Sequence, residues 1–158
     1  MSSDSGSRDV LTVQRVIPAP PEAIFDLLVD PGKHPLIDGS GSVKHARSGG
    51  RRLALGDSFG MDMKLGVAYS TRNVVVELKD NRVIAWQTLA PAPLDKLITG
   101  RIWRYELTPV EGGTLVKVTW DIRSEAALSK PAVRRMAPMT ERNMTRTLER
   151  IEEILTES

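Results

Sequence analysis

RIWRYELTPVEGGTLVKVTWDI, residues 101–122, consists of two runs of alternating side chains separated by a turn. Every second residue in 103–107 and in 116–122 is aromatic or aliphatic, and the residues between them are mostly polar. Glu111-Gly112-Gly113 has the composition of a tight hairpin turn. Because successive side chains of a strand point to opposite faces, the stretch predicts two antiparallel strands that share one apolar face.

The same period of two residues occurs on the N-terminal side of this hairpin. In residues 59–67, apolar side chains from Phe59 to Val67 alternate with glycine, aspartate and lysine. In residues 70–80, the alternation places Val74, Val76 and Leu78 on one face. Further strands are predicted at residues 10–17, 43–48 and 82–89. Strands joined by tight turns predict an antiparallel sheet.

Two segments have helical spacing instead. Residues 22–30 (EAIFDLLVD) follow a proline-rich stretch and contain apolar side chains three and four positions apart. In residues 139–155, the side chains of Met144, Leu148, Ile151 and Leu155 form one apolar stripe. A long amphipathic helix of this kind can cover the apolar face of a sheet. We therefore predict an α+β fold of two layers.

The composition is that of an ordinary globular chain. It has 158 residues, 41% of them hydrophobic, with a net charge of +2 at pH 7 and no cysteine. We expect one domain at residues 10–158, preceded by a disordered lead at residues 1–9. Disulfides are excluded, and the small net charge does not support a nucleic-acid partner. No apolar run is long enough for a transmembrane segment or a signal peptide, so we expect a cytoplasmic protein.

HPLIDGSGSV, residues 34–43, has the most catalytic appearance of any stretch in the chain. Asp38 stands where the first glycine of a Gly-x-Ser-x-Gly nucleophile elbow should be. The stretch also lacks the Gly-x-Gly-x-x-Gly spacing of a dinucleotide site. We interpret it as the connector between a helix and the sheet. His34 and Asp38 are retained as candidates for contact with a ligand.

Four strings occur in a fixed order along the chain, namely residues 13–35 (VQRVIPAPPEAIFDLLVDPGKHP), 37–41 (IDGSG), 101–121 and 148–155 (LERIEEIL). Together they resemble the START-like SRPBCC superfamily, or helix-grip fold, and within it the polyketide cyclase/dehydrase branch. The resemblance implies a curved antiparallel sheet of about seven strands gripping the long C-terminal helix. It also implies two short helices after the first strand and an internal cavity for an apolar molecule.

The inward face of the predicted sheet carries methionine and aromatic side chains. Methionine adapts to varied apolar shapes, and tryptophan and tyrosine bring polar atoms that need partners when they are buried. Ordinary core packing is the alternative interpretation for each of them. The predicted ligand-binding residues are Phe59, Met61, Met63, Leu65, Tyr69, Trp86, Trp103, Tyr105, Trp120, Met136, Met139 and Met144, with His34 and Asp38.

Charged residues give weaker indications. Arg101 and Arg104 flank Trp103, and an inward arginine could anchor a carboxylate or enolate. By alternation Arg104 points away from the Trp103 face, and the alternation places no acidic residue on the apolar face. The two histidines, His34 and His45, do not have metal-ligand spacing, so no metal and no cofactor is predicted. The basic stretch 44–52 is either a solvated turn or a contact for anionic lipid or RNA.

Three functions follow from these observations. The first is the binding or carriage of a small hydrophobic ligand, either a lipid or a polyketide-like compound, in an internal cavity. The second is a polyketide cyclase/dehydratase-type enzyme, for which Tyr69, Tyr105, Arg104 and His34 are the residues to test first. The third is a non-catalytic module that binds a protein partner. No catalytic residue is assigned, and we expect a monomer or a homodimer.

Overall fold

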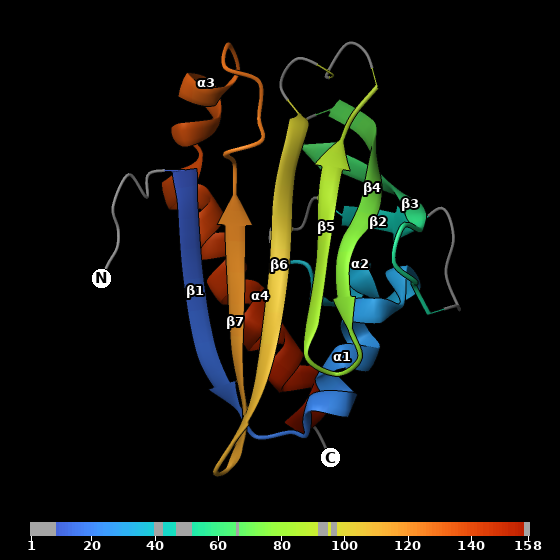
Figure 1. Cartoon of the computed structure of the whole chain (residues 1–158), viewed down its shortest axis with the longest axis vertical. Coiled ribbons are helices and arrows are strands. Elements are labelled where there is room, and N and C mark those ends of the chain that lie inside the picture. The colour runs from blue at the N-terminus through green and yellow to red at the C-terminus, as the bar shows by residue number, and fades with distance from the viewer. Residues whose placement is uncertain are drawn as a thin grey trace.

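An antiparallel sheet of seven strands forms one layer of the described structure (Figure 1). The computed structural model describes residues 9–39, 43–46, 52–65, 67–91, 95 and 98–156, with only the backbone described at 43–46, 65 and 67. Residues 1–8 of the predicted lead and most of the basic stretch 44–52 therefore lie outside the described residues. The strands are β1 (Val10–Ile17), β2 (Val43–Ala46), β3 (Ser58–Leu65), β4 (Val67–Lys79), β5 (Val83–Leu89), β6 (Thr99–Val110) and β7 (Gly113–Asp121).

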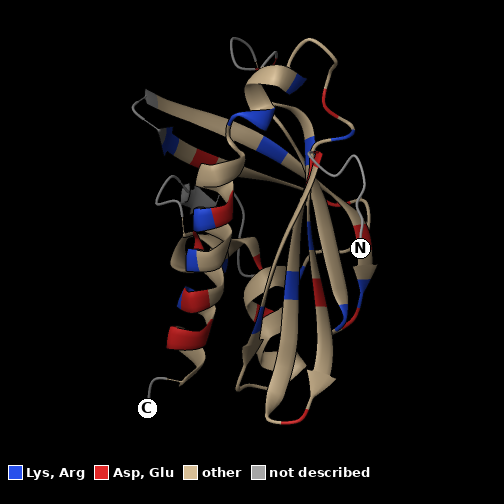
Figure 2. Cartoon of the chain, turned by 90° about the vertical axis from the view of Figure 1, so that its left-hand side faces the viewer, with Lys and Arg blue, Asp and Glu red and all other residues tan. Residues whose placement is uncertain are grey.

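Helices form the second layer. The longest, α4 (Ala137–Thr156), crosses one face of the sheet, and Figure 2 shows the helix on one side of the molecule and most of the strands on the other. The others are α1 (Pro21–Val29), a 3-10 turn η2 (Pro31–Lys33), α2 (His34–Ile37) and α3 (Lys130–Arg134). The predicted α+β class is therefore confirmed, with a sheet that grips the C-terminal helix and short helices after the first strand.

The order of the strands brings distant parts of the chain together. Strands β2 to β7 lie side by side in chain order, and β1 pairs with β7 at the far edge, with Val10 opposite Asp121 and Ile17 opposite Thr114. Gly113 makes this closure possible, because its φ is +151° and a Cβ there would overlap the carbonyl oxygen of Ile17. The hairpin predicted at residues 101–122 is the pair β6 and β7.

Strand β4 contains an irregularity that the alternation pattern did not predict. Its pairing with β5 shifts by one residue after Val75, which leaves Val76 as an extra residue in the strand. Val75 is buried, whereas Val76 is 43% exposed. Beyond the bulge, Leu78 packs against the core again. The expectation that Val74, Val76 and Leu78 share one face is therefore wrong.

The core lies between the sheet and α4. Met144, Leu148 and Ile151 of the predicted apolar stripe are buried, and Leu155 is partly buried against the same cluster. They belong to one cluster of apolar side chains with the inward residues of the central strands and of α1. The helical period and the strand period thus place apolar faces opposite one another, as the two-layer fold requires.

Candidate functional site

A cavity of about 280 Å³ lies inside this two-layer arrangement. Its wall contains every residue predicted to contact a ligand except Leu65, whose side chain is not among those described. By element these are His34 on α2 with Asp38 after it, Phe59, Met61 and Met63 on β3, Tyr69 on β4, Trp86 on β5, Trp103 and Tyr105 on β6, Trp120 on β7, Met136 before α4, and Met139 and Met144 on α4. Their contact with a ligand is still a prediction.

Aromatic rings form one side of the cavity. The imidazole of His34 stacks on Trp86 with ring centroids 4.9 Å apart, and it meets the ring of Phe59 edge-on at 5.4 Å. Trp86 also stacks with Tyr105 at 5.7 Å. Across the sheet, Trp103 is in register with both Trp86 and Trp120. These cross-strand pairs hold flat, polarisable surfaces toward the interior.

His34 is part of the cavity wall rather than a solvated loop residue, since it is 7% exposed. Its Nε2 lies 2.7 Å from the carbonyl oxygen of Leu28, and a carbonyl can only accept, so Nε2 carries the hydrogen. Burial lowers the pKa of His34 below its ordinary value. At pH 7 the imidazole is therefore neutral, and its Nδ1 is a hydrogen-bond acceptor.

A small polar cluster lies within the apolar lining. The hydroxyl of Thr88 donates to Oδ1 of Asn73 at 2.7 Å, and Nδ2 of Asn73 donates to the hydroxyl of Thr71 at 3.3 Å and to the carbonyl of Phe59 at 3.4 Å. Asn73 is 3% exposed. The sequence pattern did not identify these residues, although Thr71 is in register with Met61, a predicted wall residue.

A buried ion pair adjoins the same cavity. Arg101 lines the wall, and its Nε donates to Oε2 of Glu125 at 3.0 Å. The other oxygen of Glu125 accepts from the hydroxyl of Thr99 at 2.5 Å and from its backbone N–H at 3.3 Å. The side chain of Glu125 is 0% exposed and that of Arg101 is 8% exposed. Alternation could not find Glu125, because it lies beyond the end of β7.

The two tyrosines of the wall are uncharged at neutral pH. Burial raises the pKa of Tyr105, and it also raises the pKa of Tyr69, with the positive charge of Arg101 partly opposing the shift. Both phenol groups can therefore donate and accept hydrogen bonds.

Arg104 has no part in the cavity. It lies on the outer face of the sheet, with Nε 2.7 Å from Oε1 of Glu77 and Nη1 2.7 Å from Oε2 of Glu106. The hydrogen bonds from Arg104 hold the pKa of Glu77 below its ordinary value. The outward direction predicted by alternation is therefore observed. Arg101, which lies earlier on the same strand and lines the cavity, therefore replaces Arg104 among the residues to test for catalysis.

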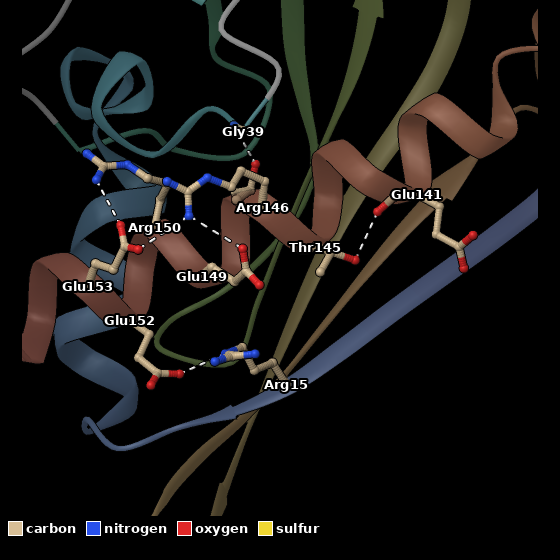
Figure 3. Close-up of polar contacts among 10 residues, drawn as sticks. Arg15, Gly39, Glu141, Thr145, Arg146, Glu149, Arg150, Glu152 and Glu153 are labelled. Atoms are coloured by element: carbon tan, nitrogen blue, oxygen red, sulfur yellow. Dashed lines mark hydrogen bonds and ion pairs between the residues drawn. The ribbon is translucent and has the colours of Figure 1, made fainter.

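The connector 34–39 is attached to the side of α4 (Figure 3). The backbone N–H of Gly39 donates to the hydroxyl of Thr147 at 2.8 Å, and Nη2 of Arg150 donates to the carbonyl of Leu36 at 3.2 Å. A Cβ at Gly39 would overlap the carbonyl oxygen of Asn143 and lie 2.6 Å from the backbone nitrogen of Thr147. This close approach fixes α2, and with it His34, at the cavity.

Two kinds of feature are not found in the described part of the chain. No group of three or more histidine, aspartate or glutamate residues is arranged to hold a metal ion there. Among the described helices, none combines the length and the apolar composition that crossing a membrane requires.

Residues 8–156 match the family described as polyketide cyclase / dehydrase and lipid transport, and the chain belongs to this family. The START-like, polyketide cyclase-type resemblance seen in the sequence is thereby confirmed. Over 104 residues, or 65% of this chain, the sequence is 33% identical to the uncharacterized protein Rv0088 of Mycobacterium tuberculosis strain H37Rv. The match covers 42% of that protein, so the chain spans less than half the length of this relative.

Solved structures show the same fold at low sequence identity. A solution structure of a protein from Arthrobacter aurescens superposes with a TM-score of 0.73 at 15% identity, covering 99% of this chain and 91% of the other. StfQ, the di-domain ARO/CYC of the steffimycin biosynthetic pathway, gives a TM-score of 0.67 at 17% identity, covering 91% of this chain and 49% of the other. These likenesses establish the fold alone.

Proposed function

We propose that the protein binds a compact, largely apolar ligand in the cavity between the sheet and α4. The observation that carries the proposal is the cavity of about 280 Å³, lined by methionine and aromatic side chains. Close-packed protein interiors contain few voids larger than a water molecule. Small-molecule sites typically occupy about 300–1,000 Å³ and combine an apolar lining with a few polar groups. The cavity lies near the lower end of this range.

The lining also favours a ligand with rings over one that needs a long straight channel. Trp86, Tyr105 and His34 present stacked flat surfaces, and aromatic pairs contribute beyond simple burial of apolar area. The methionines of β3 and α4 can adjust to the outline of the bound molecule. A polyketide-like or other polycyclic compound fits this chemistry better than a saturated chain does.

The proposal is tested by native mass spectrometry after gentle purification, followed by titration with a panel of lipids and polycyclic phenols. Trp86, Trp103 and Trp120 all line the cavity, so binding should change tryptophan fluorescence. Met63→Trp, which fills the cavity from β3, should abolish binding and leave the fold intact. Val76→Trp, on the exposed side of β4, is the matched control. A panel without uptake, or unchanged binding by Met63→Trp, would contradict the proposal.

A second candidate is a cyclase or dehydratase acting on a poly-β-ketone. The observation in its favour is that His34, Arg101 and the hydroxyl-bearing Tyr69 and Tyr105 line one cavity. A neutral imidazole can accept a proton, and a guanidinium or phenol can donate hydrogen bonds to a developing enolate. If this holds, His34→Gln should lower turnover of a poly-β-ketone with little change in its affinity. Equal turnover by both proteins would leave ligand binding as the function.

The third function predicted from the sequence, a module that binds a protein partner, depends on the arginine-rich side of α4 and on the basic stretch 44–52, most of which lies outside the described residues. On α4, Arg146 pairs with Glu149 and Glu153, and Arg15 of β1 pairs with Glu152 (Figure 3). Figure 2 shows acidic and basic residues mixed along this helix. A surface whose charges are balanced in this way gives no specific support for a charged partner.

A further inference from the structure

The charged groups at the cavity decide which ligands it can accept. Among the described wall residues, the acidic and basic side chains are those of Asp38, Arg101 and His34, and the lowered pKa of His34 leaves its imidazole neutral at pH 7. Glu125 lies directly behind Arg101 and has a side chain that is 0% exposed. Arg101 and Glu125 thus place one basic and one acidic side chain in direct contact at this part of the wall.

The positive charge of Arg101 is already compensated. Its Nε lies 3.0 Å from Oε2 of Glu125, inside the protein. Thr99 holds the same carboxylate through its hydroxyl and its backbone N–H, so Glu125 is fixed in position. Desolvated charges persist in a protein when they are paired and hydrogen-bonded, as these are.

From this arrangement we infer that the cavity prefers uncharged ligands that carry a carbonyl or hydroxyl oxygen over carboxylates of the same shape. The inference rests on the proposed ligand-binding function and specifies the class of ligand. A bound carboxylate would lose its hydration and would place a second carboxylate beside Arg101, whose charge Glu125 already balances. A neutral oxygen can accept a hydrogen bond from a guanidinium or an amide without adding charge.

Without Glu125, the opposite preference, for carboxylate ligands, would be expected. A buried arginine without a paired carboxylate would be a natural anchor for an anionic ligand, because guanidinium binds carboxylates in a bidentate manner. In this structure the carboxylate bound by Arg101 belongs to the protein itself. A guanidinium carries five N–H donors and binds Glu125 here through Nε–H, and the Arg101–Glu125 pair as a whole has no net charge.

The test compares naphthaleneacetate with naphthaleneacetamide, which have the same ring system and similar shapes but differ in charge. Dissociation constants are measured at pH 7 by isothermal titration calorimetry with the full chain. The amide should bind at least about tenfold more tightly. Equal or tighter binding of the acetate would overturn the inference and leave the proposed function standing. Binding of neither probe, combined with no uptake from the wider panel, would overturn both.

A pair of variants tests the role of Glu125 directly. Glu125→Gln removes the carboxylate that neutralises Arg101, so the affinity for the acetate relative to the amide should rise at least about tenfold. Glu77→Gln removes the carboxylate paired with Arg104 on the outer face and should keep the wild-type ratio. An unchanged ratio in folded Glu125→Gln would contradict the inference. If that variant does not fold, the two probes with the wild-type protein decide the question.

Discussion

Replacing Gly39 by alanine should destabilise the protein, because the connector 34–39 lies directly against α4. The added Cβ would overlap the carbonyl oxygen of Asn143 and would lie 2.8 Å from Cβ of Arg146. Two of its closest neighbours are backbone atoms of a helix, which cannot move aside as a flexible side chain could. The connector must therefore shift away and lose the 2.8 Å hydrogen bond from Gly39 N–H to Thr147.

The expected loss can be estimated from these two contributions. Overpacking costs about 1–3 kcal/mol and a lost hydrogen bond costs about 1 kcal/mol, which gives about 2–4 kcal/mol for Gly39→Ala. The free energy of unfolding is measured by urea denaturation with far-ultraviolet circular dichroism. For a chain of this length, the corresponding fall in Tm is about 4–16 °C.

Thr147→Val is the control, because it removes the same hydrogen bond without adding an atom at the contact. It should lower the free energy of unfolding by about 1 kcal/mol. If Gly39→Ala is no less stable than Thr147→Val, the close approach of the connector to α4 does not constrain the fold, and the reasoning fails.

Three further predictions concern the interior. Burial lowers the pKa of His34 from its ordinary value of 6.5, so the unfolded chain binds a proton first as the pH falls. The contribution of His34 to the free energy of unfolding should therefore be constant above pH 6.5 and should decrease below pH 6.5 until the lowered pKa is reached. His34→Gln should remove this decrease in urea titrations at several pH values. Leu148→Ala, at a fully buried position of α4, should cost about 2–5 kcal/mol in the same assay, and a loss below about 1 kcal/mol would contradict the packing described. Asn73→Leu should cost about 1–3 kcal/mol by leaving the hydroxyl of Thr88 without its acceptor, and adding Thr88→Val should restore part of that loss if the buried hydrogen bond is the cause.

The side-chain period predicted much of the fold and of the cavity wall. Trp103 and Tyr105 alternate along one strand, and Met61 and Met63 along another, so the residues that face α4 could be identified before any pairing was known. The stripe that includes Leu148 located the covering helix in the same way. These predictions succeed because burial on one face of a regular element repeats at the period of that element.

The parts that could not be predicted depend on contacts between elements. The bulge at Val76 is defined by the pairing of β4 with β5, and no local composition marks it. Glu125 becomes buried because the turn after β7 folds back onto β6, where Thr99 and Arg101 hold its carboxylate. Neither position belongs to a repeating pattern. The sequence therefore could not predict the Arg101–Glu125 pair beside the cavity, which depends on how the strands pair.

The distribution of sulfur has a consequence for oxidative damage. The chain has no cysteine, and five of its six methionines line the cavity, while the sixth, Met1, lies outside the described residues. Oxidation of a thioether to a sulfoxide turns a flexible apolar side chain into a polar one. Peroxide that entered this protein would therefore change the surface that faces the ligand and leave the aliphatic packing under α1 and β1 chemically unaltered. A bound ligand would shield those sulfur atoms, so the rate of methionine oxidation would report on occupancy.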